Sequence, residues 1–392
     1  MAKKIVLVTA GGHIAPFHAA MKNMHDTLNK IKPGKFELWG ADDGLEGLID
    51  GRFIPINYEH IEECRAGSLI GADRKVADSG KVAEVINSHK DVYAVIMMGG
   101  DNHLGEASKL WKEAGIRIVG YPKTMDGDLS SFITLGWETA VTIGAMQTRL
   151  HHNSAITNRR VFYIGLFGRN TDWTVTGVSA YGGGDLAIPC EQKYDFDYVW
   201  ENIEGALKHN KEKYGKEFAV VPYSEGARIK GVKEPPKEHR SKDAHGLPKL
   251  LPEWLGMELV RLTKEKGKSS AFQAHTYDMR DSPPTETDMR LSAMAGEECI
   301  KMIVEGDFGK GVIFYEDGNG FYTTGRDELE NLSKQKRVKS SGFFDYKNLI
   351  PTALFGRTYA DLFRNSLGEI PKKDNFVYKN MRKSKKQCAT TP

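Results

Sequence analysis

Residues 92–105 read VYAVIMMGGDNHLG, in which a short apolar run ends abruptly in two glycines and an aspartate. A run of this length, rich in β-branched and aliphatic residues and closed by turn residues, is typical of a buried strand. Runs of the same kind recur along the chain at residues 5–10, 116–120, 161–167, 218–222 and 311–315. The chain is therefore predicted to contain several short buried strands.

Helical spacing of apolar residues occupies the stretches between most of these runs, for example residues 74–88 and 137–151. Strands that alternate with helices indicate an α/β fold whose mainly parallel sheets are covered by helices on both faces. Ligands of such sheets bind beyond the carboxyl ends of the strands. The residues directly after each apolar run are therefore the first candidates for a functional site.

The composition is that of a globular protein, with 40% hydrophobic and 27% charged residues, and it excludes the disordered and collagenous classes. A chain of 392 residues is long enough for two compact domains. Its apolar runs are far shorter than the roughly 20 residues needed to span a bilayer. We therefore predict no association with a membrane.

Charge and cysteine content bear on partners and location. The formal net charge of +3 is too small to predict nucleic-acid binding, and we expect the basic tail at residues 372–386 to be a solvated terminus. The four cysteines show no CxxC spacing, so no disulfide framework is expected. Because the first residues also lack the pattern of a signal peptide, we expect a reducing, cytoplasmic location.

Three of the apolar runs are followed by glycines, aspartates or both. The three segments are Gly11-Gly12, Gly99-Gly100-Asp101 and residues 122–128, which read PKTMDGD. A glycine pair at a strand end lets backbone N–H groups approach a bound anion, although each pair by itself also fits a tight turn. Three such strand ends, two of them with aspartates, predict a phosphate site.

The segment Asp126-Gly127-Asp128 is the sharpest local feature of the chain. One carboxylate can face a substrate hydroxyl while the other helps to hold a hydrated metal ion, and Asp101 can supply a further carboxylate. Mg²⁺ typically uses one or two carboxylates together with phosphate oxygens and water. An isolated Asp-Gly-Asp also occurs in surface turns, but Lys123 and Thr124 directly upstream suit phosphate oxygens. Signatures of other chemistries, namely GxxxxGK[ST], HExxH, zinc-spaced Cys/His and GxSxG, are absent from the sequence.

The ordered set of motifs resembles the phosphofructokinase family. GGD at residues 99–101 and PKTMDGD at residues 122–128 carry the resemblance most clearly. Further pieces that match in order are residues 67–74, residues 132–147, FGR at 167–169, SEG at 224–226 and residues 277–283. The resemblance covers about residues 5–305, and although each piece is weak, the ordered set is highly specific.

The resemblance implies two Rossmann-like α/β/α domains with mainly parallel sheets and the active site in the cleft between them. The first domain is expected at residues 1–149, completed by about residues 280–305, and the second at residues 150–279. Residues 306–392 are expected to form a C-terminal extension that packs on the second domain. Residues 228–252, which are rich in proline and charge, are expected to form a surface insertion.

The resemblance also implies roles for individual residues. Asp126 would take the proton from the sugar 1-hydroxyl as that oxygen attacks the transferred phosphoryl group, and Asp101 and Asp128 would bind Mg²⁺. Positioning and charge neutralisation of the phosphoryl donor would fall to Gly11, Gly12, Arg74, Gly100, Asn102, Lys123 and Thr124, of which Arg74, Lys123 and Thr124 also count as catalytic. Substrate binding would involve Thr124, Asp126, Asp128, Phe167, Gly168, Arg169, Glu225, Tyr277 and Arg280, with Arg280 on the 6-phosphate. Arg160 would arrive from a neighbouring subunit, which implies a homo-oligomer, either a dimer or a tetramer.

The residue after GGD bears on the phosphoryl donor. In this family it is commonly glycine in ATP users and aspartate in pyrophosphate users, because a side chain there intrudes on the α-phosphate of ATP. Here it is Asn102, which has nearly the bulk of aspartate, and Lys123 and Tyr277 also resemble pyrophosphate enzymes. The expected reaction is phosphoryl transfer from pyrophosphate to the 1-hydroxyl of fructose 6-phosphate, a step of glycolysis or gluconeogenesis. ATP remains the alternative donor.

Two departures from the family pattern keep other functions open. The arginine expected six residues before Tyr277 is Ala271, with Lys268 nearby, so another sugar or sugar phosphate remains a possible acceptor. Asn102 and His103 also fit a regulatory subunit that has lost catalysis. The residues that favour an active enzyme are Asp101, Thr124, Asp126, Asp128 and Arg169.

Overall fold

The computed structural model describes residues 2–12, 14–242, 246, 249–317 and 321–368 of the chain. They form two compact units. The first consists mainly of residues 1–139 and 280–336, and the second of residues 140–241, 248–279 and 337–392, with the undescribed positions left aside. The basic tail at residues 372–386 lies outside the described residues.

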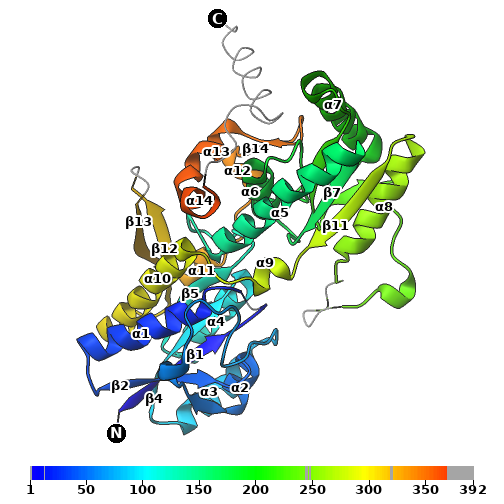
Figure 1. Cartoon of the computed structure of the whole chain (residues 1–392). Helices are drawn as coiled ribbons and strands as arrows, with labels where there is room; N and C mark the ends of the chain where they lie inside the picture. The colour runs from blue at the N-terminus through cyan, green and yellow to red at the C-terminus, as the bar shows by residue number, and fades with distance from the viewer. Residues whose placement is uncertain (1, 13, 243–245, 247–248, 318–320, 369–392) are drawn as a thin grey trace, which may run out of the picture. The chain divides into compact units, whose positions relative to one another are not determined.

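The first unit is built on an eight-stranded sheet with the order β13-β12-β5-β4-β1-β2-β3, to which β6 adds beside β5 (Figure 1). The pairs β1–β2, β1–β4, β4–β5 and β5–β12 are parallel, whereas β3 and β13 are antiparallel edge strands. The strands are β1 (Lys3–Thr9), β2 (Phe36–Ala41), β3 (Phe53–Pro55), β4 (Val92–Gly99), β5 (Ile118–Thr124), β6 (Leu135–Gly136), β12 (Lys310–Glu316) and β13 (Tyr322–Glu328).

Helices bury both faces of this sheet. Leu104 of α4 packs with Val6 and Val8 of β1 in one buried cluster, while the hydroxyls of Tyr121 on β5 and Ser292 on α10 hydrogen-bond on the other face. The helices of this unit are α1 (Phe17–Ile31), α2 (Leu45–Asp50), η1 (Tyr58–His60), α3 (Ser79–Ser88), α4 (Asp101–Ala114), α10 (Glu286–Glu305) and α11 (Leu329–Leu332). Figure 1 shows α1 and α10 lying side by side. Successive side chains of a strand point to opposite faces of the sheet. Because helices cover both faces, the strands are apolar at nearly every position.

Two element boundaries differ from those predicted. The strand predicted at residues 116–120 is β5, which continues to Thr124 because Lys123 and Thr124 pair with β6. Lys123 is therefore a buried strand residue and does not belong to a loop. The helix predicted from residue 74 begins only at Ser79, because the Asp78 carboxylate accepts hydrogen bonds from the N–H groups of Gly80 and Lys81 and so caps it.

The second unit has a smaller parallel sheet with the order β11-β7-β9 (Figure 1). Two short strand pairs, β8–β10 and β14–β15, accompany it. The strands are β7 (Val161–Leu166), β8 (Lys193–Asp195), β9 (Ala219–Ser224), β10 (Arg228–Lys230), β11 (Ser270–His275), β14 (Phe344–Asp345) and β15 (Ile350–Pro351). The helices are α6 (Trp173–Gly182), α7 (Phe196–Tyr214), η2 (Lys237–His239), α8 (Pro252–Glu265), α12 (Val338–Ser341), α13 (Ala353–Thr358) and α14 (Ala360–Leu367). Two of the unit boundaries fall within α5 (Trp137–Asn158) and α9 (Asp278–Asp281).

The C-terminal region differs from the extension that was expected. Its part up to residue 336 belongs to the first unit, because β12 pairs with β5 and β13 pairs with β12 along its whole length. Only the chain after residue 336 belongs to the second unit. There the Tyr346 hydroxyl hydrogen-bonds Asp172 at 2.8 Å and Glu191 at 3.1 Å. The region is thus divided between the units at Lys336.

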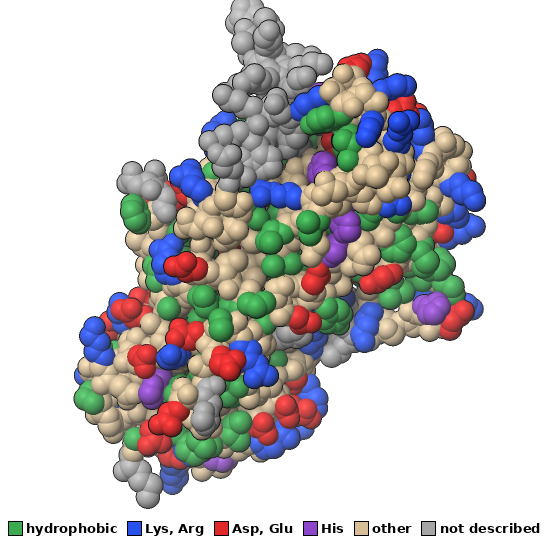
Figure 2. All heavy atoms as spheres, in the orientation of Figure 1, with side chains coloured by type: hydrophobic (Ala, Val, Ile, Leu, Met, Phe, Trp, Pro, Cys, Tyr) green, Lys and Arg blue, Asp and Glu red, His purple; other side chains and the backbone are tan. Residues whose placement is uncertain are grey.

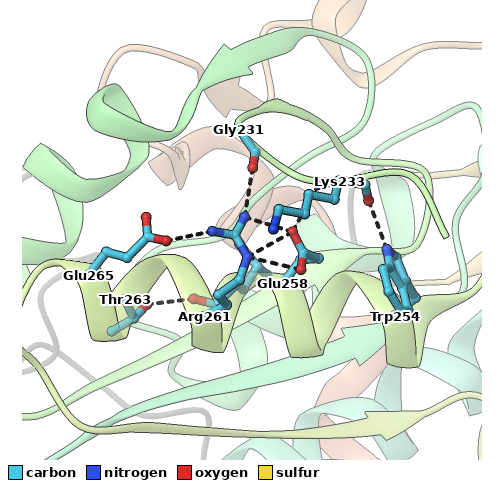
Figure 3. A network of polar contacts seen from close by, with 8 residues as sticks. Gly231, Lys233, Trp254, Glu258, Arg261, Thr263 and Glu265 are labelled. Carbon is cyan, nitrogen blue, oxygen red and sulfur yellow. Dashed lines mark hydrogen bonds and ion pairs between the residues drawn. The ribbon is translucent and has the colours of Figure 1, made fainter. Parts of the chain in front are cut away.

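The expected insertion at residues 228–252 lies between β9 and α8 and is attached to α8 by polar contacts, although residues 243–245, 247 and 248 lie outside the described part (Figure 3). Arg261 donates to the Gly231 carbonyl at 2.9 Å, and Glu258 accepts from the Lys233 N–H at 2.9 Å. The Trp254 indole N–H donates to the Lys233 carbonyl at 2.8 Å. These contacts fix the start of the insertion on the helix that follows it.

The surface carries both signs of charge. On the face shown in Figure 2, Lys and Arg side chains are interspersed with Asp and Glu over the first unit.

Among the described residues, no helix combines the length and the apolar character that crossing a membrane requires. Three of the four cysteines lie in the described part, and none of these, Cys64, Cys190 and Cys299, forms a disulfide.

Candidate functional site

The three predicted strand ends of the first unit lie side by side at one edge of its sheet. Thr9 of β1 is paired with Met98 of β4, and Gly99 of β4 with Pro122 of β5. The chain therefore leaves these parallel strands at neighbouring points. The segments that follow, from Gly11, from Gly100 and from Met125, are brought together as the sequence predicted.

The loop after β5 is held in a defined conformation by its own threonine residues. The Thr124 hydroxyl accepts a hydrogen bond from the Asp126 N–H at 3.1 Å, and the Thr124 carbonyl accepts one from the Thr134 hydroxyl at 2.7 Å. Gly127 has φ of +72°, a left-handed conformation that side chains disfavour. The loop turns at this glycine, which leaves Asp126 partly accessible and Asp128 only 4% exposed.

The carboxylates of Asp101 and Asp128 approach each other across two of these strand ends. Nε2 of Gln335 donates to Oδ2 of Asp128 at 3.0 Å and to Oδ2 of Asp101 at 3.5 Å. Burial raises the pKa of Asp128 well above its ordinary value, and the negative charges of Asp126 and Asp101 raise it further. Its other oxygen, Oδ1, is buried without a hydrogen-bond partner among the described residues. The like charges of Asp101 and Asp126 therefore act on a third, buried carboxyl group.

Cationic side chains surround the glycines after β1. The Lys123 ammonium donates to the Gly12 carbonyl at 2.8 Å. A Cβ atom on Gly12 would lie 3.1 Å from Nη1 of Arg280 and 3.1 Å from Nη2 of Arg74, so both guanidinium groups lie against this backbone. Burial lowers the pKa of Lys123 to about 7, and the charges of Arg280 and Arg74 lower it further, against the opposing effect of Asp126 and Asp101. Three cations close together and next to glycine backbone form a site suited to a polyanion.

The donor set fits Mg²⁺ better than a metal held by protein alone. No cluster of three or more His, Cys, Asp or Glu side chains in the described residues could hold a metal ion. Two neighbouring carboxylates, Asp101 and Asp128, with a buried unpartnered oxygen on one of them, match the usual environment of Mg²⁺, which takes its remaining ligands from water and phosphate. Asp101 and Asp128 are thus the two candidate metal ligands, and Asp126 follows the same strand as Asp128.

Gly100 and Asn102 lie at the start of α4. Gly100 precedes the first helical residue, Asp101, and a Cβ on Gly100 would lie 3.5 Å from Cβ of Thr124. Asn102 is exposed in the first turn of the helix, whereas His103 is buried with its ring against Gly11. The expected donor residues Gly11, Gly12, Arg74, Gly100, Asn102, Lys123 and Thr124 thus all belong to this edge of the first unit.

The predicted sugar-binding residues of the second unit lie at the corresponding edge of its sheet. Leu166 of β7 is paired with both Ser224 of β9 and His275 of β11. The segments Phe167-Gly168-Arg169 and Ser224-Glu225-Gly226 are joined by hydrogen bonds, from the Gly226 N–H to the Gly168 carbonyl at 3.0 Å and from the Ser224 hydroxyl to the same carbonyl. The rings of Phe167 and Tyr277 meet edge to face at 5.8 Å. Phe167, Gly168, Arg169, Glu225 and Tyr277 are therefore neighbours.

Two candidates lie elsewhere. Arg160 directly precedes β7 and is therefore at its amino end, a strand length of roughly 20 Å from Phe167. Its guanidinium group contacts the Ser154 hydroxyl and lies 5.2 Å from the centre of the Phe162 ring. Arg280, expected at the sugar phosphate, belongs to the first unit beside Arg74 and also donates to the Met125 sulfur at 3.2 Å.

Sequence reasoning missed Gln335, which contacts both metal-ligand candidates. It lies more than two hundred residues from either aspartate and outside every motif. A single glutamine in a polar stretch carries no signal in the sequence, and only the return of the chain after β13 brings it to the site.

Comparisons with known proteins agree with this geometry. The family model described as phosphofructokinase matches residues 4–303. A pyrophosphate–fructose 6-phosphate 1-phosphotransferase of Streptomyces coelicolor is 26% identical over 78% of this chain and 89% of its own length. An ATP-dependent 6-phosphofructokinase of Spirochaeta thermophila is also 26% identical, over 80% of this chain and 87% of its own.

Solved structures show the same fold. A pyrophosphate-dependent phosphofructokinase from Nitrosospira multiformis, 16% identical, superposes with a TM-score of 0.77 and covers 96% of this chain and 95% of its own. One from Marinobacter aquaeolei, 17% identical, gives a TM-score of 0.73 with 95% and 94% coverage. Because the family model spans more than half of the chain and its motifs meet at the strand ends, this chain belongs to the phosphofructokinase family.

Proposed function

We propose that this protein transfers a phosphoryl group from pyrophosphate to the 1-hydroxyl of fructose 6-phosphate. The observation that carries the proposal is the meeting of Asp101, Asp126 and Asp128 with the cations Lys123, Arg74 and Arg280 at one sheet edge. Acidic groups for a metal and a base lie next to a cationic anion site, as phosphoryl transfer requires. Catalysis of this reaction rests mainly on positioning and charge neutralisation.

The residues of the site have three proposed roles: a general base, cations that bind the donor phosphates, and metal ligands. Asp126 accepts the proton of the attacking hydroxyl, since its carboxylate is partly accessible and its N–H is fixed by Thr124. Lys123 and Arg74 bind the donor phosphates beside Gly12, together with Arg280. Asp101 and Asp128 would hold Mg²⁺, which, when bound, offsets the charge that develops on the phosphoryl oxygens.

Acceptor recognition is assigned to Arg169, Glu225 and Tyr277, which neighbour one another after β7, β9 and β11. Lys268, near the Ala271 that replaces the family arginine, lies at the amino end of β11, as Arg160 lies at the amino end of β7. It lies two residues before β11, and it donates to Glu217 at 2.7 Å. The position of Arg160 away from the carboxyl edge supports its use by a neighbouring subunit and hence a homo-oligomer. A cytoplasmic location stays a prediction from the sparse cysteines.

Pyrophosphate is favoured over ATP by the side chain of Asn102 and by the compact cluster of cations at Gly12. Relatives of similar identity carry both donor specificities in their names, so ATP is the second candidate. The test is a matrix of donors and acceptors: pyrophosphate or ATP, with fructose 6-phosphate or other sugars, with and without Mg²⁺. We expect product only with Mg²⁺ and pyrophosphate. Robust turnover with ATP and none with pyrophosphate would reverse the donor assignment.

A regulatory subunit without catalysis would give no product with any combination of donor and acceptor. It would still bind a phosphorylated sugar or the donor, which calorimetry detects directly. The matrix therefore separates an enzyme with another acceptor from a protein that only binds.

A further inference from the structure

We infer that Gln335 is a positioning residue for the metal-binding carboxylates. This inference rests on the proposed function, because it concerns the pair Asp101 and Asp128. Gln335 lies beyond the residues matched by the family model and in the short segment between α11 and the end of the first unit.

The segment around Gln335 is tied to the catalytic loop on both sides. Before it, the Leu332 carbonyl accepts a hydrogen bond from the Ser130 N–H at 3.2 Å. After it, the Lys336 N–H donates to the Asp128 carbonyl at 2.6 Å, and the Lys336 ammonium donates to the Ser131 carbonyl at 3.1 Å. The backbone of Gln335 is therefore held against residues 128–131, and its side chain is not a freely moving surface group.

The amide of Gln335 then distinguishes the two oxygens of Asp128. Its Nε2 carries two N–H donors and no charge, and it engages Oδ2 of Asp128 and Oδ2 of Asp101. Oδ1 of Asp128 is left buried and without a hydrogen-bond partner among the described residues. Because a buried unpaired carboxylate oxygen is costly, this atom is the one prepared for a cation.

A neutral donor suits this task better than a lysine or an arginine would. A cation at this position would cancel the negative charge that attracts Mg²⁺, whereas an amide holds both carboxylates and leaves their charge in place. Hydrogen-bond partners behind metal ligands typically change metal affinity by about 10–100-fold when they are removed. Gln335 thus has the geometry of such a partner for two ligands at once.

The test measures metal binding without turnover. Mn²⁺ would be titrated into the full-length protein in the presence of imidodiphosphate, a non-hydrolysable pyrophosphate analogue, with free Mn²⁺ followed by electron paramagnetic resonance. Gln335→Met keeps the length of the side chain and removes both donors, so we expect the Kd for Mn²⁺ to rise by about 10–100-fold. Lys334→Met is the matched control, because this ammonium contacts Asn331 within its own segment, and its Kd should stay at the wild-type value.

A second variant separates failure of this inference from failure of the metal site. Asp128→Asn should lose Mn²⁺ binding. If Asp128→Asn binds Mn²⁺ as the wild type does, Asp128 is not a metal ligand, and the inference about Gln335 is wrong as well. If Asp128→Asn loses binding but Gln335→Met retains the wild-type Kd, the metal site stands and the role of Gln335 is overturned.

Kinetics add a readout that a merely structural role would not give. In Gln335→Met the Mg²⁺ concentration for half-maximal activity should rise by about 10–100-fold, while kcat at saturating Mg²⁺ stays within about threefold of wild type. A fall in kcat that excess Mg²⁺ does not restore would contradict a positioning role.

Discussion

Two clusters of charged side chains, one in each unit, use the same residue types in opposite ways. On α8 of the second unit, Arg261 makes a two-pronged contact with Glu258, from Nε to Oε1 at 3.0 Å and from Nη2 to Oε2 at 2.7 Å (Figure 3). Hydrogen bonds from Arg261 lower the pKa of Glu258. At the strand ends of the first unit, burial and neighbouring carboxylates raise the pKa of Asp128.

The difference separates a structural cluster from a functional one. In the α8 cluster each charge meets its opposite, so the contacts stabilise the fold and leave little to bind a ligand. In the strand-end cluster neighbouring carboxylates raise the pKa of Asp128 and neighbouring guanidinium groups lower the pKa of Lys123, effects that a metal ion and an anion would offset. Substitutions in the two clusters should therefore change different quantities.

The largest effect is expected at Asp126. Asp126→Ser should lower kcat by about 10²–10⁴-fold, since the proton of the attacking hydroxyl loses its acceptor. Melting temperature and near-UV circular dichroism should match the wild type. Asp361→Ser, at a surface aspartate that pairs with Arg364 on α14, is the control and should keep full activity. Substantial turnover by a folded Asp126→Ser protein would exclude Asp126 as the base.

Lys123 should make donor use depend on pH. The pKa of this buried ammonium is lowered to about 7, and only its charged form attracts pyrophosphate. We expect kcat/KM for pyrophosphate to fall as pH rises above 7, approaching about tenfold per pH unit. In Lys123→Gln, kcat/KM should be low and should not fall further as pH rises above 7. A wild-type profile that stays flat from pH 7 to 9 would contradict the assignment.

The same pKa predicts an effect on stability of the opposite sign. Between about pH 7 and the ordinary value of 10.5 the unfolded state binds a proton at Lys123 that the folded state does not. The contribution of Lys123 to the free energy of unfolding therefore rises with pH over this window. Urea unfolding of wild type and Lys123→Gln across the window should show the difference.

A smaller effect is expected at Gly12. Its φ is not in the left-handed region, so Gly12→Ala adds no backbone strain, but the new methyl group would press on the Arg74 and Arg280 guanidinium groups at 3.1 Å. We expect the KM for pyrophosphate to rise by about tenfold, or about 1.4 kcal/mol, with little change in kcat. Gly105→Ala on α4 is the control. The added Cβ atom would lie 3.9 Å from its nearest neighbour, Ser333, so both constants should stay unchanged.

The smallest effect on function is expected in the α8 cluster. Glu258→Gln should lower the free energy of unfolding by about 1 kcal/mol, because a charge-assisted contact with Arg261 becomes a neutral one. Activity with pyrophosphate should not change. Thermal and urea unfolding measure the first outcome and steady-state kinetics the second. A large loss of activity in a stable Glu258→Gln protein would remove the distinction between the two clusters.

Much of the fold and of the strand-end site follows from the sequence by itself. The apolar runs that became β1, β4, β5, β7, β9 and β12 are local signals, and so are the glycines and aspartates that follow three of them. Because parallel strands end at a common edge, the sequence by itself predicts that Asp101 and Asp126 lie near each other there.

Tertiary structure decided what depends on contacts between distant parts of the chain. Packing of the chain buried Lys123 beside Arg280 and Arg74 and so lowered its pKa, and pairing of β12 with β5 placed residues up to 336 in the first unit. That return of the chain placed Gln335 against Asp101 and Asp128. No periodicity or motif predicts such contacts, because strand pairing and burial depend on which surfaces meet when the whole chain packs.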